Sequence, residues 1–155
     1  MRRLLACLVI GCAAAGPAAN AAPAKNGRGT MCVLHARLSA GNETTGSTST
    51  AKGHTLIKVR TNGTIEFKTK ILNRNHETFV AGHIHQAPVG VAGPIVVPLF
   101  VVPSPPTSAR HIKQKGVGTP NPGTTGADLC ASPSAYYVNY HTTAFPGGAI
   151  RGQLR

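Results

Sequence analysis

The sequence predicts an all-β fold, built either as an antiparallel β-sandwich or as a partly closed barrel, and three observations carry this prediction. The chain of 155 residues contains 18 glycines and 12 prolines, which is typical of a domain with many turns. Several stretches alternate apolar and polar residues with a period of two, the pattern of half-buried strands. Leucine-rich helical periodicity is scarce, and the length suffices for one domain with a hydrophobic core.

Residues 1–21 have the features of a signal peptide. Two arginines form a charged start, residues 4–15 form an apolar segment too short to span a bilayer, and Ala19-Asn20-Ala21 is a small-x-small cleavage site. We therefore expect an exported protein, periplasmic or extracellular, with no transmembrane segment in the mature chain. Lipidation at Cys12 is the alternative, since the residues before it resemble a lipobox, but the apolar segment preceding it is short.

Export would place the remaining cysteines in an oxidising compartment. Cys7 and Cys12 would leave with the signal peptide, whereas Cys32 and Cys130 would remain as an even pair. A disulfide between them is the expected state, and closing so long a loop is worth about 3–5 kcal/mol in chain-entropy terms. A thiol metal site is the alternative, although neither cysteine has a CxxC partner.

The first strand is predicted after a short linker. Residues 22–30 are small and basic without an apolar pattern, and we expect a disordered linker before a domain at residues 31–155. Residues 32–38 alternate, so this strand has an apolar face made of Cys32, Leu34, Ala36 and Leu38. The polar residues 39–53 then form a long loop.

A hairpin follows, and its register is fixed by the hydrophobic phase. A two-residue turn would pair the apolar Val59 with Glu66, whereas a three-residue loop with Gly63 in the left-handed conformation places Val59 opposite Ile65. We predict the three-residue loop. It defines two strands, at residues 54–60 and 64–71, with the further pairs Lys58–Glu66 and Ile57–Phe67.

The C-terminal half contains four more predicted strands, at residues 78–85, 95–102, 136–142 and 149–154. Pro98 lies inside one of them and indicates a sheet edge or a bulge. Residues 103–134 are rich in proline and glycine, and we expect a long irregular loop before the last strands, with at most a helical turn at residues 126–131.

Three histidines are candidate metal ligands. His83 and His85 leave one face of their strand, because side chains two residues apart in a strand point the same way. His141 shares a face with Tyr137 and Asn139 on a later strand. If the two strands are neighbours, the three imidazoles converge, and imidazole suits copper or zinc with one position left open. The alternative is a structural, hydrogen-bonded polar cluster.

Two polar residues near the histidines have structural and functional interpretations. Asn139 either orients a histidine through a hydrogen bond or caps neighbouring backbone. Arg151 is interpreted as a structural residue that binds a backbone carbonyl or the terminal carboxylate.

Two blocks of sequence resemble the chordin-type (CHRD) domain in its bacterial single-domain form. They are GHIHQAPVGVAGPIVVPL at residues 82–99 and YYVNYHTTAFPGGAIRGQL at residues 136–154. The resemblance extends from about Met31 to the end and implies an exported β-sandwich or barrel, but no settled activity. The His-x-His strand is also similar to that of copper–zinc superoxide dismutases, although the segment that would supply a bridging histidine and an aspartate for a second metal is missing.

The chain carries 16 lysines and arginines against 4 acids. So few acids exclude paired-carboxylate catalysis, and the basic excess favours an anionic partner. Arg110, Lys113 and Lys115 form a candidate contact patch for an anionic envelope polymer or polysaccharide, with a solvated basic surface as the alternative. With three Tyr, four Phe and no Trp, and without a nucleic-acid motif, specific nucleic-acid binding is not expected.

The preferred hypothesis is an exported, non-enzymatic CHRD-type binding protein that holds copper or zinc through His83, His85 and His141. One alternative is a copper-dependent redox enzyme of superoxide-dismutase-like architecture. The other is a metal-free adhesion or envelope-associated module.

Overall fold

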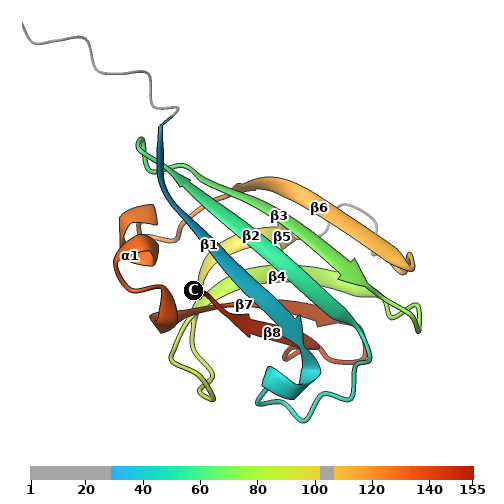
Figure 1. Cartoon of the computed structure of the whole chain (residues 1–155). Helices are drawn as coiled ribbons and strands as arrows, with labels where there is room; N and C mark the ends of the chain where they lie inside the picture. Colours follow the sequence, from blue (N-terminus) through green and yellow to red (C-terminus); the bar gives the residue numbers. More distant parts are fainter. Residues whose placement is uncertain (1–28, 102–106) are drawn as a thin grey trace, which may run out of the picture.

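The computed structural model describes residues 29–101 and 107–155, so the predicted signal peptide and most of the predicted linker lie outside the described residues. Within these ranges, eight antiparallel strands form one sheet in the order β5-β4-β7-β8-β1-β2-β3-β6. The sheet curls into a nearly closed barrel (Figure 1). The all-β prediction is confirmed, in its barrel form. The strands are β1 (Thr30–Ser39), β2 (Lys52–Arg60), β3 (Ile65–Leu72), β4 (Phe79–Gln86), β5 (Ile95–Val101), β6 (His111–Gly118), β7 (Tyr136–Thr142) and β8 (Ile150–Gln153).

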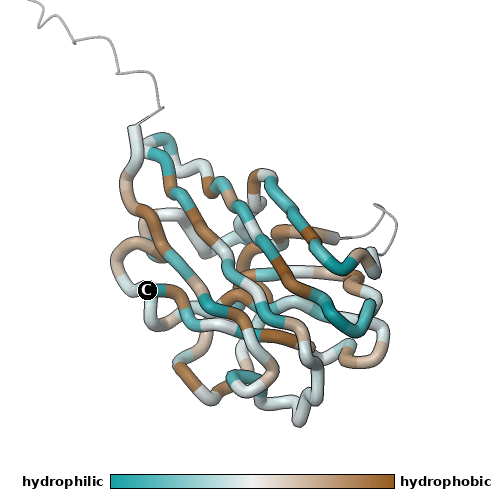
Figure 2. Tube along the Cα trace, turned by 45° about the vertical axis from the view of Figure 1, so that its right-hand side comes forward, coloured by the Kyte–Doolittle hydropathy of each residue, from teal (hydrophilic) through white to brown (hydrophobic). Residues whose placement is uncertain are grey.

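The first three strands follow the predicted alternation, which Figure 2 shows as a change between hydrophilic and hydrophobic colour along them. In β1, the inward side chains of Leu34, Ala36 and Leu38 are buried. The β2–β3 hairpin pairs Val59 with Ile65, and Gly63 adopts φ +85° in the loop. The predicted register is therefore confirmed, because only this register puts all the apolar residues inside.

A chain of hydroxyl groups connects opposite walls inside the barrel. The Tyr140 hydroxyl on β7 donates to Thr69 Oγ1 on β3 at 2.8 Å. Thr69 Oγ1 in turn lies 2.8 Å from Thr55 Oγ1 on β2. Gly82 is required beside this chain, since a Cβ there would lie 2.5 Å from the Tyr140 ring. These buried polar groups are thus satisfied by one another across the core.

The barrel closes between its two edge strands, β5 and β6. The main-chain N–H of Asn121, just after β6, donates to the carbonyl of Val96 at 2.8 Å. The Asn121 side chain donates to the carbonyl of Ile95, also at 2.8 Å. Pro98 lies in β5, so the prediction of an edge position is confirmed.

One part of the predicted irregular loop is a strand. Strand β6 pairs with β3 from Ile65 to Leu72, so the expectation of a structureless segment throughout residues 103–134 is wrong for residues 111–118. The inward positions of β6 include Gln114 and Gly116, which removed the apolar alternation that marks a strand. Gly116 is needed there because a Cβ would lie 2.9 Å from the Phe67 ring. Residues 102–106 lie outside the described residues.

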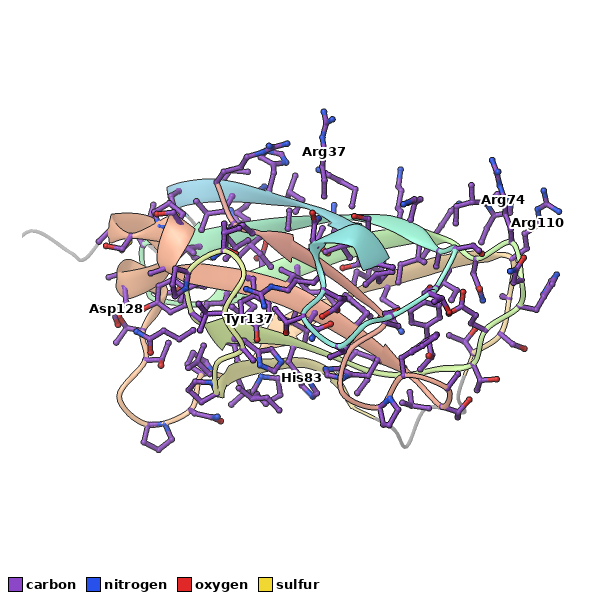
Figure 3. All side chains as sticks on the ribbon, turned by 90° about the horizontal axis from the view of Figure 1, so that it is seen from below. Arg37, Arg74, His83, Arg110, Asp128 and Tyr137 are labelled. Carbon is purple, nitrogen blue, oxygen red and sulfur yellow. A yellow bond between two sulfur atoms is a disulfide. The ribbon has the colours of Figure 1, made fainter. Side chains whose placement is uncertain are left out.

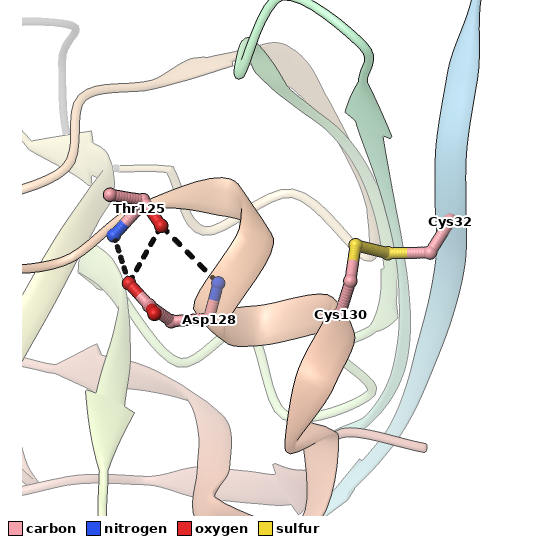
Figure 4. The surroundings of a disulfide bond; sticks show 4 residues. All are labelled: Cys32, Thr125, Asp128 and Cys130. Atoms are coloured by element: carbon pink, nitrogen blue, oxygen red, sulfur yellow. Dashed lines mark hydrogen bonds between the residues drawn. A yellow bond between two sulfur atoms is a disulfide. The ribbon is translucent and has the colours of Figure 1, made fainter.

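The predicted helical turn is α1 (Gly126–Ala131), followed by the 3-10 turn η2 (Pro133–Ala135). Thr125 and Asp128 form a capping box, in which each side chain binds the main-chain N–H of the other (Figure 4). The predicted disulfide joins Cys32 of β1 to Cys130 of α1, with the Cα atoms 5.9 Å apart. Within the described ranges, no helix is long and apolar enough to cross a membrane.

Candidate metal centre

The two strands that carry the candidate ligands are neighbours. Strands β4 and β7 pair with His83 opposite Asn139 and His85 opposite Tyr137. Ile84, which lies between His83 and His85 in β4, is fully buried in the core. The histidines therefore leave the opposite side of the sheet, on the outer wall of the barrel.

The predicted convergence of the three histidines is confirmed. The nitrogen atoms that His83, His85 and His141 can offer to a metal all lie within 4.8 Å of one another. His83 Nδ1 lies 3.1 Å from His141 Nε2, and the ring centroids of His83 and His85 are 5.7 Å apart. We call these three residues the histidine cluster.

Main-chain carbonyls fix the tautomers of two of these rings. His85 Nδ1 lies 2.9 Å from the carbonyl oxygen of Gly93, and His141 Nδ1 lies 2.9 Å from that of Pro146. A carbonyl only accepts, so each Nδ1 carries the proton and each Nε2 has a lone pair that can accept a hydrogen bond or bind a metal. His141 Nε2 accepts from His83 Nδ1, whereas His85 Nε2 is buried without a hydrogen-bond partner.

Burial keeps the histidine cluster neutral. Desolvation lowers the pKa of His83 to about 4, with smaller contributions from His141 and His85. Desolvation is also the main cause that lowers the pKa of His85 and of His141, and their hydrogen bonds to the carbonyls act in the opposite direction. Neutral imidazole is the form that binds a metal.

Strand β7 is buried on both sides, because loops cover the outer wall here. The loop at residues 87–94 follows β4 and is held by β8. Arg151 Nη2 donates to the carbonyl of Pro88 at 3.0 Å, and Gln153 Nε2 donates to that of Ala87 at 2.9 Å. The Gly93 N–H donates to the Tyr137 hydroxyl at 3.1 Å. The carbonyl that fixes His85 thus depends on side chains from β7 and β8.

Arg151, Tyr137 and His85 form a three-layer stack behind the cluster. The Arg151 guanidinium carbon lies 3.4 Å from the centroid of the Tyr137 ring. On its other side, Tyr137 stacks on His85 at 4.9 Å with an interplanar angle of 14°. Arg151 is only 2% exposed, and its bond to the carbonyl of Pro88 confirms its structural interpretation.

A half-buried acid, Glu43, lies near this stack. Desolvation raises the pKa of Glu43 to about 7, while the charge of Arg151 acts to lower it. Asn139 lies close by, since a Cβ on Gly148 would contact both the Asn139 amide and the Glu43 carboxylate. Asn139 Oδ1 is buried without a hydrogen-bond partner, so the role of Asn139 in orienting a histidine stays a prediction.

Sequence reasoning missed several contributors to this site. Gly93 and Glu43 lie in loops whose position depends on hydrogen bonds to distant strands, and no local pattern marks them. Tyr137 could have been found, because it shares a strand face with His141. Outside the cluster, sequence reasoning did not foresee that His35 Nδ1 lies 3.3 Å from His54 Nε2.

The predicted anion-contact residues lie elsewhere. Lys113 and Lys115 are exposed on β6, and Arg110 precedes that strand. In Figure 3, Arg110 and Arg37 point outward from the molecule away from His83. The basic patch and the histidine cluster are therefore separate features.

A family model for the CHRD domain matches residues 34–154, which include the histidine cluster, Arg151 and all strands from β2 to β8. The chain belongs to the CHRD domain family. No curated protein matches the sequence. No solved structure matches the chain either.

The geometry of this CHRD domain fits a nitrogen-ligated metal ion. Two nitrogens bound to a tetrahedral zinc ion at 2.0–2.1 Å lie about 3.3 Å apart, close to the 3.1 Å between His83 Nδ1 and His141 Nε2. The unpaired, buried His85 Nε2 would be the third donor, since the ligand atoms of the three histidines all lie within 4.8 Å of one another. A set of three imidazoles suits zinc or copper and leaves one coordination position open.

Proposed function

We propose that this CHRD domain is an exported binding protein that holds a copper or zinc ion through His83, His85 and His141. The observation that carries the proposal is His85 Nε2, a lone pair that is buried beside two other imidazoles without a partner. Such an atom costs free energy unless it binds something. A metal ion would use this lone pair and replace the hydrogen bond between His83 and His141.

The surroundings of the cluster support a pre-organised ligand set. The carbonyls of Gly93 and Pro146 accept the Nδ1 protons of His85 and His141, which orients each Nε2 and raises its basicity. The stack of Arg151 and Tyr137 fixes the ring plane of His85. Binding would therefore require little rearrangement of these two ligands.

Export is supported by the signal-peptide pattern of residues 1–21 and by the disulfide between Cys32 and Cys130. Disulfides persist in oxidising compartments and are rare in the cytosol. The proposed protein thus meets its metal outside the cytoplasm.

Titration calorimetry of the metal-free protein with Cu²⁺ and with Zn²⁺ tests the proposal. We expect saturable binding of one ion per chain near neutral pH, and a nitrogen-rich type 2 EPR signal for copper. The variants His83→Ala, His85→Ala and His141→Ala should each lower the affinity by about 100-fold or more. The matched control is His111→Ala, since His111 is exposed on β6.

The same preparation distinguishes the two alternatives. Absence of saturable binding in the wild type at micromolar metal would contradict the proposal and favour a metal-free adhesion module. Catalytic removal of superoxide by the copper-loaded protein, lost in His83→Ala, would instead favour a redox enzyme. Histidine variants that lose stability but keep metal affinity would also contradict the proposal.

A further inference from the structure

The outer faces of β1, β2, β3 and β6 carry a continuous row of basic residues, in which the pKa of His54 is lowered by desolvation and by its basic neighbours. The strand registers place Arg37 opposite His54, His54 opposite Lys70, and Lys70 opposite Lys113. All four side chains are exposed. Neighbouring strands lie about 4.7–4.9 Å apart, so the row offers a basic side chain about every 5 Å across the sheet.

A second row runs beside the first. Lys68 on β3 lies directly opposite Lys115 on β6, and His35 on β1 is hydrogen bonded to His54 of the first row. We call the two rows together the basic face, which consists of His35, Arg37, His54, Lys68, Lys70, Lys113 and Lys115. It contains two of the three residues of the predicted patch, and Arg110 lies just before β6.

The lysine pairs are not explained by the fold. Like charges directly opposite one another in an antiparallel sheet are destabilising, and this surface has two such pairs side by side, Lys68–Lys115 and Lys70–Lys113. Among the four acids of the chain, Glu66 alone lies on these strands, and it is bound to Arg60 at 2.9 Å. An anionic ligand would relieve the repulsion that the sheet itself leaves uncompensated.

The surface is shallowly hollowed along these rows. A depression of about 300 Å³ is lined by all four lysines. A second one, of about 320 Å³, adjoins it and is lined by Lys70, Lys113, His54 and His111 among others. These hollows give a bound chain van der Waals contact with the stems of the lysines as well as charge contacts with their ends.

We propose that the basic face binds a linear anionic polysaccharide that runs across the strands. The two lysines of each pair lie on neighbouring strands about 5 Å apart, which is comparable to the length of one sugar unit. A polymer with a sulfate or carboxylate on each unit would therefore place its charges in register with the pairs Lys68–Lys115 and Lys70–Lys113. The Cys32–Cys130 disulfide indicates an oxidising compartment, where such polymers are accessible partners.

Two other polyanions fit this surface less well. The residues of the two rows include no Phe, Tyr or Trp on which a base could stack, and stacking is a main source of affinity for single-stranded nucleic acid. The exposed apolar side chains of Val33 and Val117 lie at the ends of another row, opposite Lys58 and Glu66. Within the second row, Leu56 of β2 lies between His35 and Lys68 and is half-buried. The two rows thus offer one partly covered apolar side chain, which is little for insertion into a lipid surface.

The experiment measures binding of a defined heparin oligosaccharide, with neutral dextran as the control ligand, at several salt concentrations. We expect wild-type binding that weakens steeply with salt and no binding of dextran. The variant Lys70→Gln/Lys113→Gln should lose about tenfold or more in affinity and show a shallower salt dependence. Lys70→Gln alone is compared with Arg74→Gln, which removes the same charge from the exposed turn between β3 and β4. Melting temperatures verify that each variant is folded.

Several results would overturn the proposal. Lack of heparin binding near 0.1 M salt would end it. An equal effect of Lys70→Gln and Arg74→Gln would show that net charge, and not this face, determines binding. Tighter binding of a short duplex DNA or of anionic lipid vesicles, with the same dependence on Lys70 and Lys113, would assign the face to that partner instead. None of these results depends on the metal site.

Discussion

The two sides of the barrel differ in the environment of their polar side chains, which are covered by loops on one side and exposed on the other. On the side formed by β4, β7 and β8, loops cover the sheet, and buried donors bind carbonyls or stack on an aromatic ring, as His141 and Arg151 do. On the side formed by β1, β2, β3 and β6, no such cover exists over the exposed Lys68, Lys70, Lys113 and Lys115, and cations face cations across the strands.

This difference explains why each side suits a different ligand. Desolvation on the covered side lowers the pKa of His83 to about 4, which yields neutral donors for a metal ion. Exposure on the bare side keeps the lysines hydrated and charged, so they attract a polyanion from solution. The same sheet thus provides coordination chemistry on one side and long-range electrostatics on the other.

The largest effect is expected from removing the one covalent bond that ties β1 to α1. The variant Cys32→Ala/Cys130→Ala opens a loop that spans 98 residues, and the free energy of unfolding should fall by about 4 kcal/mol because the unfolded chain gains conformational freedom. Urea denaturation measures it. Both ligand affinities of the folded variant should change by less than about twofold, since the disulfide contacts neither site. If the variant lost affinity for only one of the two ligands, the disulfide would contribute to that ligand's site, contrary to this expectation.

Removing an arginine from the covered side should cost far more than removing one from the bare side. Arg151→Ala should lower the free energy of unfolding by about 3 kcal/mol, because the variant loses the stack on Tyr137 and the bond to Pro88, and leaves a cavity. Metal affinity should fall too, since the loop that holds His85 loosens. Arg37→Ala is the control, expected within about 0.5 kcal/mol of wild type because Arg37 is exposed. Equal losses of unfolding free energy in Arg151→Ala and Arg37→Ala would contradict the expected difference between the covered and the bare side.

The sequence predicted those parts of the molecule in which local pattern and tertiary structure agree. Apolar alternation gave the face of β1 and the β2–β3 register, because one side of each strand is filled with apolar residues. The period of two also placed His83 and His85 together, and the pairing of β4 with β7 brought His141 to them. None of this required knowledge of the loops.

The rest depended on long-range contacts that leave no local signal. Strand β6 was missed because its inward position 116 is a glycine and not an apolar side chain. The Phe67 ring of β3 fills the space beside Gly116, so the sequence of β6 lacks the apolar alternation of a strand. Without β6, the pairing of Lys68 with Lys115 could not be foreseen, and the basic face was predicted only as a patch around Lys113. Gly93 became part of the site through a hydrogen bond to Tyr137.

Acid should destabilise the covered side. The pKa of His83 is 6.5 in the unfolded chain and about 4 in the folded one, so the unfolded chain binds more protons between these values and stability falls as the pH decreases. The lowered pKa values of His85 and His141 act in the same direction. Glu43 acts oppositely, because its pKa is raised from 4.5 to about 7 and its contribution is lost as the pH rises through 7.

The shifts of His83 and Glu43 are of similar size and act in opposite directions. The lowered pKa values of His85 and His141 therefore decide the sign, and we expect a net loss of stability from pH 7 to pH 5. Urea denaturation at the two pH values measures it for the metal-free protein. His83→Gln should flatten the dependence, and Glu43→Gln should steepen it. An unchanged slope in His83→Gln would contradict the assignment.

The smallest effect is expected on the bare side, and its sign is reversed. Lys115→Glu replaces the repulsion of Lys68 by an attraction across the strands, so the free energy of unfolding should rise by about 0.2–1 kcal/mol at low salt and less at high salt. Heparin affinity should fall in the same variant. Lys52→Glu is the control, because it makes the same charge change opposite Leu72 and should give a smaller gain. If Lys115→Glu is destabilising, or if Lys52→Glu is stabilising to the same degree, the lysine pairs do not strain the fold. An anionic ligand would then not be needed to account for the two lysine pairs.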